Sequence, residues 1–312
     1  MSRRAWTWVR LAVAAAALGT IVWRLGTGPF RDGLNAVDAD VLAAAAGIGV
    51  LTTICCAWRW TVVARGLGVD LSLPAAVAAY YRSIFLNLTL PGGVVGDVHR
   101  GVSHGQDAGD VSRGLRAVAW ERAAGQAVQG VLTLIVLAAL PSPVRSYVAP
   151  VAIGLIAVAI AGLVLVKRVR PAGRSWWARL RGGVVGDVRA GLLARRALPV
   201  VALTSAVVVL GHAAAFLIAA RAAGVTAPPI EMLPLAMLAM LGMVVPGIAG
   251  WGPREGATAW VFAAAGLGAD QGVATAVVYG VMALVASAPG ALVLVSDGLA
   301  RAAVRTDRVA DA

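Results

Sequence analysis

Residues 246–256 read Pro-Gly-Ile-Ala-Gly-Trp-Gly-Pro-Arg-Glu-Gly and lie between two strongly apolar segments. The four glycines and two prolines of this stretch do not continue a helix, because glycine loses backbone entropy and proline lacks the amide donor. The same stretch places the adjacent charges of Arg254 and Glu255 in apolar surroundings. Broken backbone at membrane depth survives only where protein or a water-filled cavity satisfies its amides. We therefore predict a substrate-binding site here, to which Gly247, Trp251, Arg254 and Glu255 contribute.

The composition excludes an ordinary soluble protein. Hydrophobic residues make up 60% of the 312 residues and charged residues only 13%, and the mean hydropathy is +0.82. These values predict one all-α, multi-pass membrane domain over residues 1–312. The net charge of +12 does not indicate nucleic-acid binding, because the arginines lie beside apolar spans, where they set topology and contact anionic lipid. The neighbouring Cys55 and Cys56 form no disulfide framework.

Six apolar segments are near the roughly 20 residues that a membrane-crossing helix needs. They are Val9–Trp23, Val41–Val63, Ala117–Leu140, Val148–Val166, Leu198–Ala220 and Gln271–Val295. Basic loops stay in the cytoplasm, and Lys167–Arg196 carries nine basic residues against one acid. Both termini are then cytoplasmic, and the arginine-rich, high-alanine composition indicates a bacterial cytoplasmic membrane. We interpret the N-terminal segment as a retained anchor, the alternative being a cleaved secretory signal.

Two further apolar segments are too short to cross. Residues 74–88 rise only about 22 Å before Thr89-Leu90-Pro91-Gly92-Gly93 breaks the helix. The second short segment opens at Pro229 and breaks at Pro246. We predict two re-entrant half-helix hairpins, which return through residues 94–104 and 253–267. Two spans, a hairpin and one span then occur twice, as inverted halves of about residues 1–147 and 148–312.

The first break, with Arg82 before it, carries polar residues and glycines that could bind a headgroup: Asn87, Gly92, Gly93, Gly96, Asp97 and Arg100. Asp97 suits the N-cap of the returning helix, where exposed amides could hold a phosphate. The alternative is a cytoplasmic loop of the same composition. No lysine follows the glycines, so the stretch is not a nucleotide-binding P-loop.

Glu121 and Arg122 lie on the third predicted span and point some 100° apart on a helix, so each needs another partner. Glu121, Gly125 and Gln129 recur at every fourth residue and predict a polar stripe that faces the bundle interior. The alternative is a charged turn at the membrane interface. For Arg254 and Glu255 at the second break, residues 246–256, the alternative is a capped helix start with Arg254 reaching outward.

Catalytic and metal-binding patterns are not found in the sequence. The three histidines, His99, His104 and His212, have no spacing that pairs them as metal ligands on one helix. No serine, histidine and aspartate arrangement of a nucleophilic enzyme occurs either. We therefore expect no catalytic residue, no metal and no cofactor.

Three motifs resemble those of a known family. Leu-Pro-Gly-Gly-x-x-Gly-Asp-x-x-Arg at Leu90–Arg100, Glu121-Arg122, and the glycine- and proline-rich stretch at Pro246–Gly256 are similar to motifs of the flippase-like membrane family. This family is named for the membrane region of lysylphosphatidylglycerol synthase, and the resemblance covers nearly the whole chain. It implies a lipid-handling membrane protein, because the best-understood relatives move an aminoacylated phospholipid between leaflets.

The sequence departs from the family in two ways. Relatives with synthase activity have a soluble aminoacyl-transfer domain after the membrane region, whereas this sequence ends about 17 residues after the last predicted span, so we expect no synthase activity. Many relatives also have Tyr-Arg in the last span, where this chain reads Tyr279-Gly280.

The leading hypothesis is a flippase for a phospholipid or a lipid-linked glycan, with anionic or phosphate-bearing membrane lipids as partners. Its cavity would set Arg82, Arg100, Arg122 and Arg254 against Asp97, Glu121 and Glu255, which leaves one positive charge. One alternative is a membrane enzyme or accessory subunit that acts on polyprenyl-linked sugars or cell-envelope lipids. Another is a regulator that works through the basic Lys167–Arg196 loop. The sequence predicts no particular oligomer.

Overall fold

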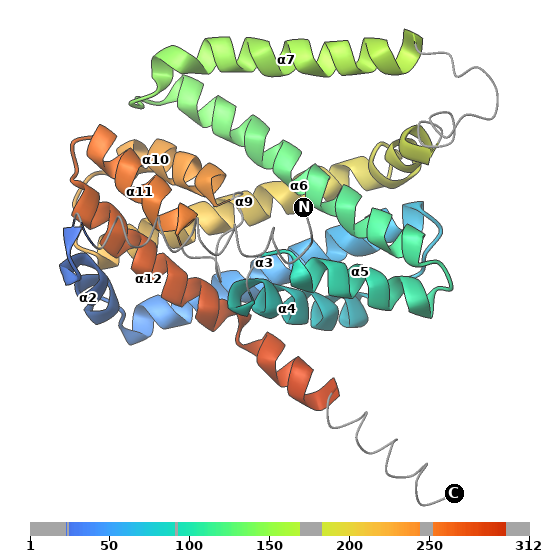
Figure 1. Ribbon diagram of the computed structural model, residues 1–312, viewed down its shortest axis with the longest axis horizontal. Helices are drawn as coiled ribbons and strands as arrows, with labels where there is room; N and C mark the ends of the chain where they lie inside the picture. The colour runs from blue at the N-terminus through green and yellow to red at the C-terminus, as the bar shows by residue number, and fades with distance from the viewer. Residues whose placement is uncertain (1–22, 24, 91–92, 169–182, 244–251, 298–312) are drawn as a thin grey trace, which may run out of the picture.

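The protein is helical throughout the part of the chain that its computed structural model describes, residues 23, 25–90, 93–168, 183–243 and 252–297 (Figure 1). Helices and the turns between them make up these ranges, which contain no strand. The predicted all-α fold class is confirmed. Three residues of the predicted site, Gly92, Gly247 and Trp251, lie outside the described ranges, as does nearly all of the first predicted span.

Four described helices are long and apolar enough to cross a membrane. They are α3 (Ala39–Gly66), α6 (Val111–Ala139), α9 (Ala197–Ala222) and α12 (Ala269–Ser287), and beyond Ala288 the last of these continues as helix to Asp297. Counted to Asp297, α12 has 29 residues. The shortest of the four is then α9, whose 26 residues rise about 39 Å, which exceeds the roughly 30 Å of a hydrocarbon core. Two further helices are α2 (Gly28–Asn35) and α7 (Arg145–Arg168), and a single π-helical turn, η1 (Val188–Leu192), precedes α9.

Local sequence explains where the long helices begin and end. The carboxylates of Asp38 and Asp110 accept hydrogen bonds from the amides of Val41 and Arg113, at 2.8 and 2.9 Å, and so cap α3 and α6. Pro141 follows one residue after Leu140, the C-cap of α6. Because a proline disfavours helical backbone in the residue before it, α6 ends there.

Between the long helices lie two pairs of short ones. These are α4 (Leu73–Thr89) with α5 (Val95–Asp107), and α10 (Pro229–Gly242) with α11 (Pro253–Ala264). The order long, short, short, long thus occurs twice, in α3 to α6 and in α9 to α12. Contacts between the two sets are reciprocal, because α4 packs on α12 and α10 packs on α6. This pattern is what inverted halves predict, although the inversion itself remains a prediction.

Glycines hold α5 tightly against α6 and so bring the first break to the long helix. A Cβ at Gly105 would lie 2.5 Å from the Cα of Val111, and one at Gly114 would lie 2.7 Å from the Cα of Gly105. The turn between the two helices passes through Gly109 at φ +72°, in the left-handed region. Larger residues here would push α5, with Asp97 and Arg100, away from Glu121.

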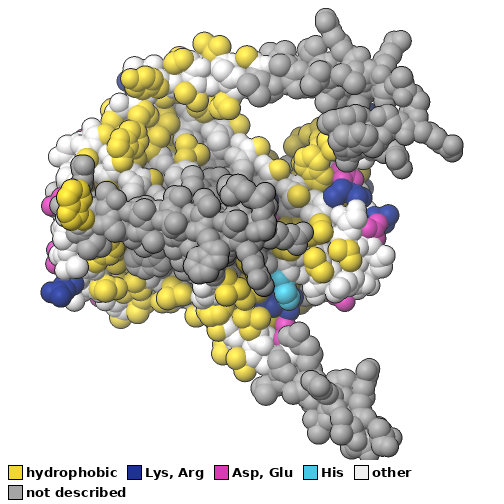
Figure 2. Space-filling model, viewed as in Figure 1, with side chains coloured by type: hydrophobic (Ala, Val, Ile, Leu, Met, Phe, Trp, Pro, Cys, Tyr) yellow, Lys and Arg dark blue, Asp and Glu magenta, His cyan; other side chains and the backbone are white. Residues whose placement is uncertain are grey.

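Two buried apolar clusters lie beside the two pairs of short helices. Trp60, Tyr80 and Ala117 belong to the cluster of α3, α4 and α6. Phe216 and Phe262 belong to the cluster that includes α9, α10, α11 and α12. Many large hydrophobic side chains are also exposed at the surface, and Figure 2 shows them spread over the described part of one face, with charged side chains toward its edges. Such extensive exposed apolar surface is expected of helices that face lipid.

Candidate functional site

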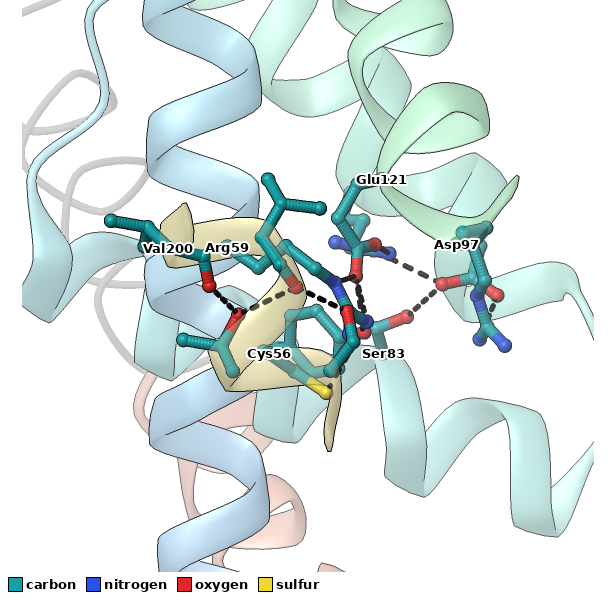
Figure 3. A network of polar contacts seen from close by, with 12 residues as sticks. Cys56, Arg59, Ser83, Asp97, Glu121 and Val200 are labelled. Carbon is teal, nitrogen blue, oxygen red and sulfur yellow. Dashed lines mark hydrogen bonds and ion pairs between the residues drawn. The ribbon is translucent and has the colours of Figure 1, made fainter. Parts of the chain in front are cut away.

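Five charged side chains from three helices meet beside the first break. We call them the arginine–carboxylate cluster: Arg59 on α3, Asp97 and Arg100 on α5, and Glu121 and Arg122 on α6. Four of the five are buried, with residue exposures of 0% for Glu121 and 7% for Asp97 at the extremes. Figure 3 shows Arg59 and Glu121 pointing toward each other, with Ser83 between them and Asp97. The cluster contains three cations and two anions, and therefore carries one net positive charge.

Glu121 is at the centre of the cluster. Its Oε1 accepts hydrogen bonds from Nε and Nη2 of Arg59 at 2.9 and 2.5 Å, and one from the hydroxyl of Tyr80 at 3.2 Å. Its Oε2 accepts from Nη2 of Arg100 at 2.7 Å. A fully buried carboxylate is tolerable only with such compensation, because an unpaired buried charge is strongly unfavourable. Glu121 and Arg122 do take different partners, as their angular separation predicts.

Asp97 collects the remaining donors. Oδ1 accepts from Ser83 and from Nε of Arg100 at 3.1 and 3.0 Å, and Oδ2 accepts from Asn87 at 3.0 Å and from Arg122. The prediction that Asp97 is an N-cap is wrong, because Val94 holds that position and Asp97 is the third residue of α5. The four side-chain donors outcompete the local amides for its carboxylate.

The side chain of Arg100 is buried. Its guanidinium lies between two aromatic rings, with Cζ 4.6 Å from the ring centroid of Trp60 and 4.3 Å from that of Tyr80. The Nη1 atom is buried and has no hydrogen-bond acceptor among the described residues. Cation–π attraction to the two ring faces offsets part of the energetic cost of the missing hydrogen bond.

The second break also holds a buried ion pair. Oε1 of Glu255 accepts from Nε and Nη2 of Arg254 at 2.9 and 2.6 Å, and its Oε2 accepts from the amide of Gly252 at 2.6 Å. Gly252 adopts φ +101°, and Pro253 follows as the first helical residue, so the predicted capped start of α11 is confirmed. Arg254 is only 4% exposed and therefore does not reach outward to the interface.

Glycines on the long helices make room for two guanidinium groups. A Cβ at Gly125 would lie 3.0 Å from Nη2 of Arg59, and a Cβ at Gly280 would lie 2.8 Å from Cζ of Arg254. Arg122 and Gly280 are both the twelfth residue of their helices, α6 and α12. In α12 this twelfth position is a glycine, and the guanidinium of Arg254 fills the space beside it. In α6 the equivalent position carries Arg122.

A cavity of about 570 Å³ lies between the two breaks. Arginines from three helices line it, namely Arg59, Arg122 and Arg254, together with polar side chains that include Gln126, Gln129, Ser205, His212 and Tyr279. Tyr279 hydroxyl and His212 Nδ1 are 3.0 Å apart. The rest of the wall is largely apolar, with Ala45, Ile48, Val208, Met282, Ala283 and Ala286 among its residues. The volume falls within the usual range of pockets for small molecules.

A comparison with known protein families identifies the family of this chain. The family model described as lysylphosphatidylglycerol synthase TM region matches residues 7–290. The chain belongs to this family. The resemblance inferred from the three motifs is thereby confirmed, and the protein is a multi-pass membrane protein of a lipid-related family. Comparisons with curated proteins and with solved structures gave no match.

In this member of the lysylphosphatidylglycerol synthase TM region family, only some of the predicted site residues line the cavity. Asn87, Gly93, Arg122 and Arg254 line the cavity, whereas Asp97, Arg100, Glu121 and Glu255 are not among its lining residues. The three carboxylates of this second group pair with arginines of the cavity wall, and Arg100 pairs with two of the carboxylates. Arg82 points elsewhere and pairs with Asp297 at the end of the last helix.

Sequence reasoning missed Arg59, which contributes a cation to both the cluster and the cavity wall. The sequence did contain a signal for Arg59, because an arginine in the middle of an apolar span is energetically costly in a membrane and usually functional. The contributions of Ser205 and His212 carried no comparable signal, since neither stands out in its span.

Proposed function

We propose that the protein is a flippase that moves a lipid with a phosphate-bearing headgroup, a phospholipid or a lipid-linked glycan, across the bacterial cytoplasmic membrane. The observation that carries the proposal is the cavity whose wall combines arginines from three helices with a largely apolar lining. Guanidinium groups bind phosphate oxygens through two parallel donors, and an apolar wall suits acyl or prenyl chains.

The cluster behind the wall supports this role. Glu121 and Asp97 neutralise part of the charge of Arg59 and Arg122, which keeps a phosphate from being held too tightly for release. Transport requires binding that is reversible, so partly compensated arginines suit it better than free ones.

For the movement itself, we propose six crossings and two re-entrant hairpins in inverted halves, with both termini in the cytoplasm. The reciprocal contacts of α4 with α12 and of α10 with α6 favour this arrangement. Rocking of one half against the other would open the cavity alternately to the two leaflets. The arginines at the two breaks would then meet the headgroup from opposite ends of its path.

The experiment is a flipping assay in proteoliposomes with phospholipids that carry a fluorophore on the acyl chain and a native headgroup. Dithionite bleaches the outer leaflet, so movement between leaflets appears as additional bleaching. Arg254→Lys keeps the charge but loses the paired donors, and we expect roughly tenfold slower movement. Arg65→Lys is the matched control, because Arg65 is exposed in the last turn of α3.

Two results would contradict the proposal at different levels. Bleaching by wild-type protein no faster than in protein-free liposomes, with each candidate lipid tested, would refute flipping itself. Equal rates for wild type and Arg254→Lys, with normal insertion of both, would instead remove Arg254 from headgroup binding.

A further inference from the structure

The cavity wall is one-sided in charge. Arg59, Arg122 and Arg254 line it, and no described lining residue is an aspartate or a glutamate. Residues 91–92 and 244–251, which lie outside the described ranges, contain no acidic residue in the sequence. A cationic group in this space would meet three guanidiniums and, among the described lining residues, no carboxylate.

The nearby carboxylates are already engaged. Glu121 and Glu255 are 0% exposed, and Asp97 is 7% exposed. Glu121 pairs with two arginines, Asp97 with two, and Glu255 with Arg254 and a backbone amide. An ammonium group could reach one of them only by displacing an arginine that is paired with it, and of these arginines only Arg122 is exposed.

A row of uncommitted amides continues from Arg122 along α6. Gln126 and Gln129 follow it at four and seven residues, so the three side chains share one helix face, and all three line the cavity. The helical rise places the amides about 6 and 10 Å beyond the arginine. Neither amide has a hydrogen-bond partner among the described residues, unlike Asn87, whose amide binds both Asp97 and the Gly96 backbone. Each glutamine offers two donors and an acceptor, the groups that match hydroxyls.

We infer that the cavity selects lipids whose phosphate is joined to a sugar or another polyol, and disfavours lipids whose phosphate is joined to an amine. This inference rests on the proposed function, since it assigns the substrate class of the same cavity. The phosphate lies against Arg122 and Arg59, and the hydroxyls bind along Gln126 and Gln129. The chemistry is shared by glycerolipids such as phosphatidylinositol and by sugars linked to polyprenyl phosphate.

Calorimetric titration of the purified full-length chain in detergent tests the inference with short-chain probes. The probes are dihexanoyl phosphatidylinositol, citronellyl phosphate mannose, dihexanoyl phosphatidylethanolamine and dihexanoyl phosphatidic acid. We expect at least one polyol lipid to bind ten or more times tighter than the ethanolamine lipid. Whichever of the two polyol lipids binds more tightly identifies the source of the headgroup.

Variants of the glutamines separate the polyol site from the phosphate site. Gln126→Leu or Gln129→Leu should weaken binding of the polyol lipid about fivefold, the factor of one neutral hydrogen bond, and leave phosphatidic acid unchanged. Gln271→Leu is the matched control, because Gln271 is exposed and does not line the cavity. Ethanolamine lipid that binds as tightly as the polyol lipids would overturn the inference, and so would equal losses for polyol lipid and phosphatidic acid. Both results leave the proposed function standing, whereas failure of every phosphate lipid to bind refutes it as well.

Discussion

Replacing Glu121 with glutamine removes the central anion of the arginine–carboxylate cluster and leaves its shape. The cluster then holds three cations and one anion, in place of three and two. Arg59 loses its only carboxylate among the described residues, and Arg100 keeps only Asp97. Breaking a buried ion pair from one side typically costs about 3–5 kcal/mol of folding free energy. At about 2–4 °C per kcal/mol, the midpoint of thermal unfolding should fall by roughly 6 to 20 °C.

The assay is tryptophan fluorescence during heating of the purified protein in detergent. Glu231→Gln is the matched control, because Glu231 is exposed in the first turn of α10 and should change the midpoint by little. Adding Arg59→Met to Glu121→Gln removes one cation and restores the net charge of one. The double variant should therefore be more stable than the sum of the single changes predicts, by about 2–3 kcal/mol. A Glu121→Gln midpoint equal to that of the control would refute the view that charge compensation holds this cluster together.

Three further predictions concern other parts of the chain. Gly280→Ala should displace the guanidinium that packs over it and slow lipid movement, whereas Gly256→Ala, with open space around its Cβ position, should not; equal rates would remove the packing argument. Burial lowers the pKa of His104, which lies outside the four crossing helices, below its usual 6.5. The folded protein therefore favours the neutral imidazole of His104, whose contribution to stability is complete above about pH 6.5 and is lost as the pH falls below that value. The variant His104→Gln should consequently flatten the acid side of a plot of unfolding midpoint against pH. In a background without Cys55 and Cys56, a single cysteine introduced at Asp38 should react with an impermeant reagent from outside, and one at Arg179 only after permeabilisation; the reverse would overturn the predicted topology.

The helices were predictable because apolar length and glycine or proline breaks are local signals. The ends of α4 and α11 follow from Pro74, Pro91 and Pro253, which lie at or next to the helix limits in the sequence. The long, short, short, long order also followed from segment lengths. Local physics of this kind needs no knowledge of the partner helix.

The partners of charged residues were less accessible to sequence reasoning. Arg82 was expected beside the first break, and it pairs with Asp297, which is 215 residues away. No local pattern predicts such a pairing. Arg59 was overlooked because the apolar average of its span concealed one charge. The N-cap prediction for Asp97 failed because other side chains, above all Arg100 on the same helix and Arg122 on α6, donate to its carboxylate.

The adjacency of Arg254 and Glu255 has an electrical consequence. The two side chains are neighbours on one short helix and are hydrogen-bonded to each other, so any displacement of α11 carries them together as a neutral pair. The transmembrane potential does about 2.3 kcal/mol of work per elementary charge at 100 mV, and a lone arginine at this place would feel that work in proportion to its travel. If the break moves during the proposed transport cycle, the paired charges of Arg254 and Glu255 carry no net charge across the membrane field, and the potential would act there on the charge of the proposed headgroup.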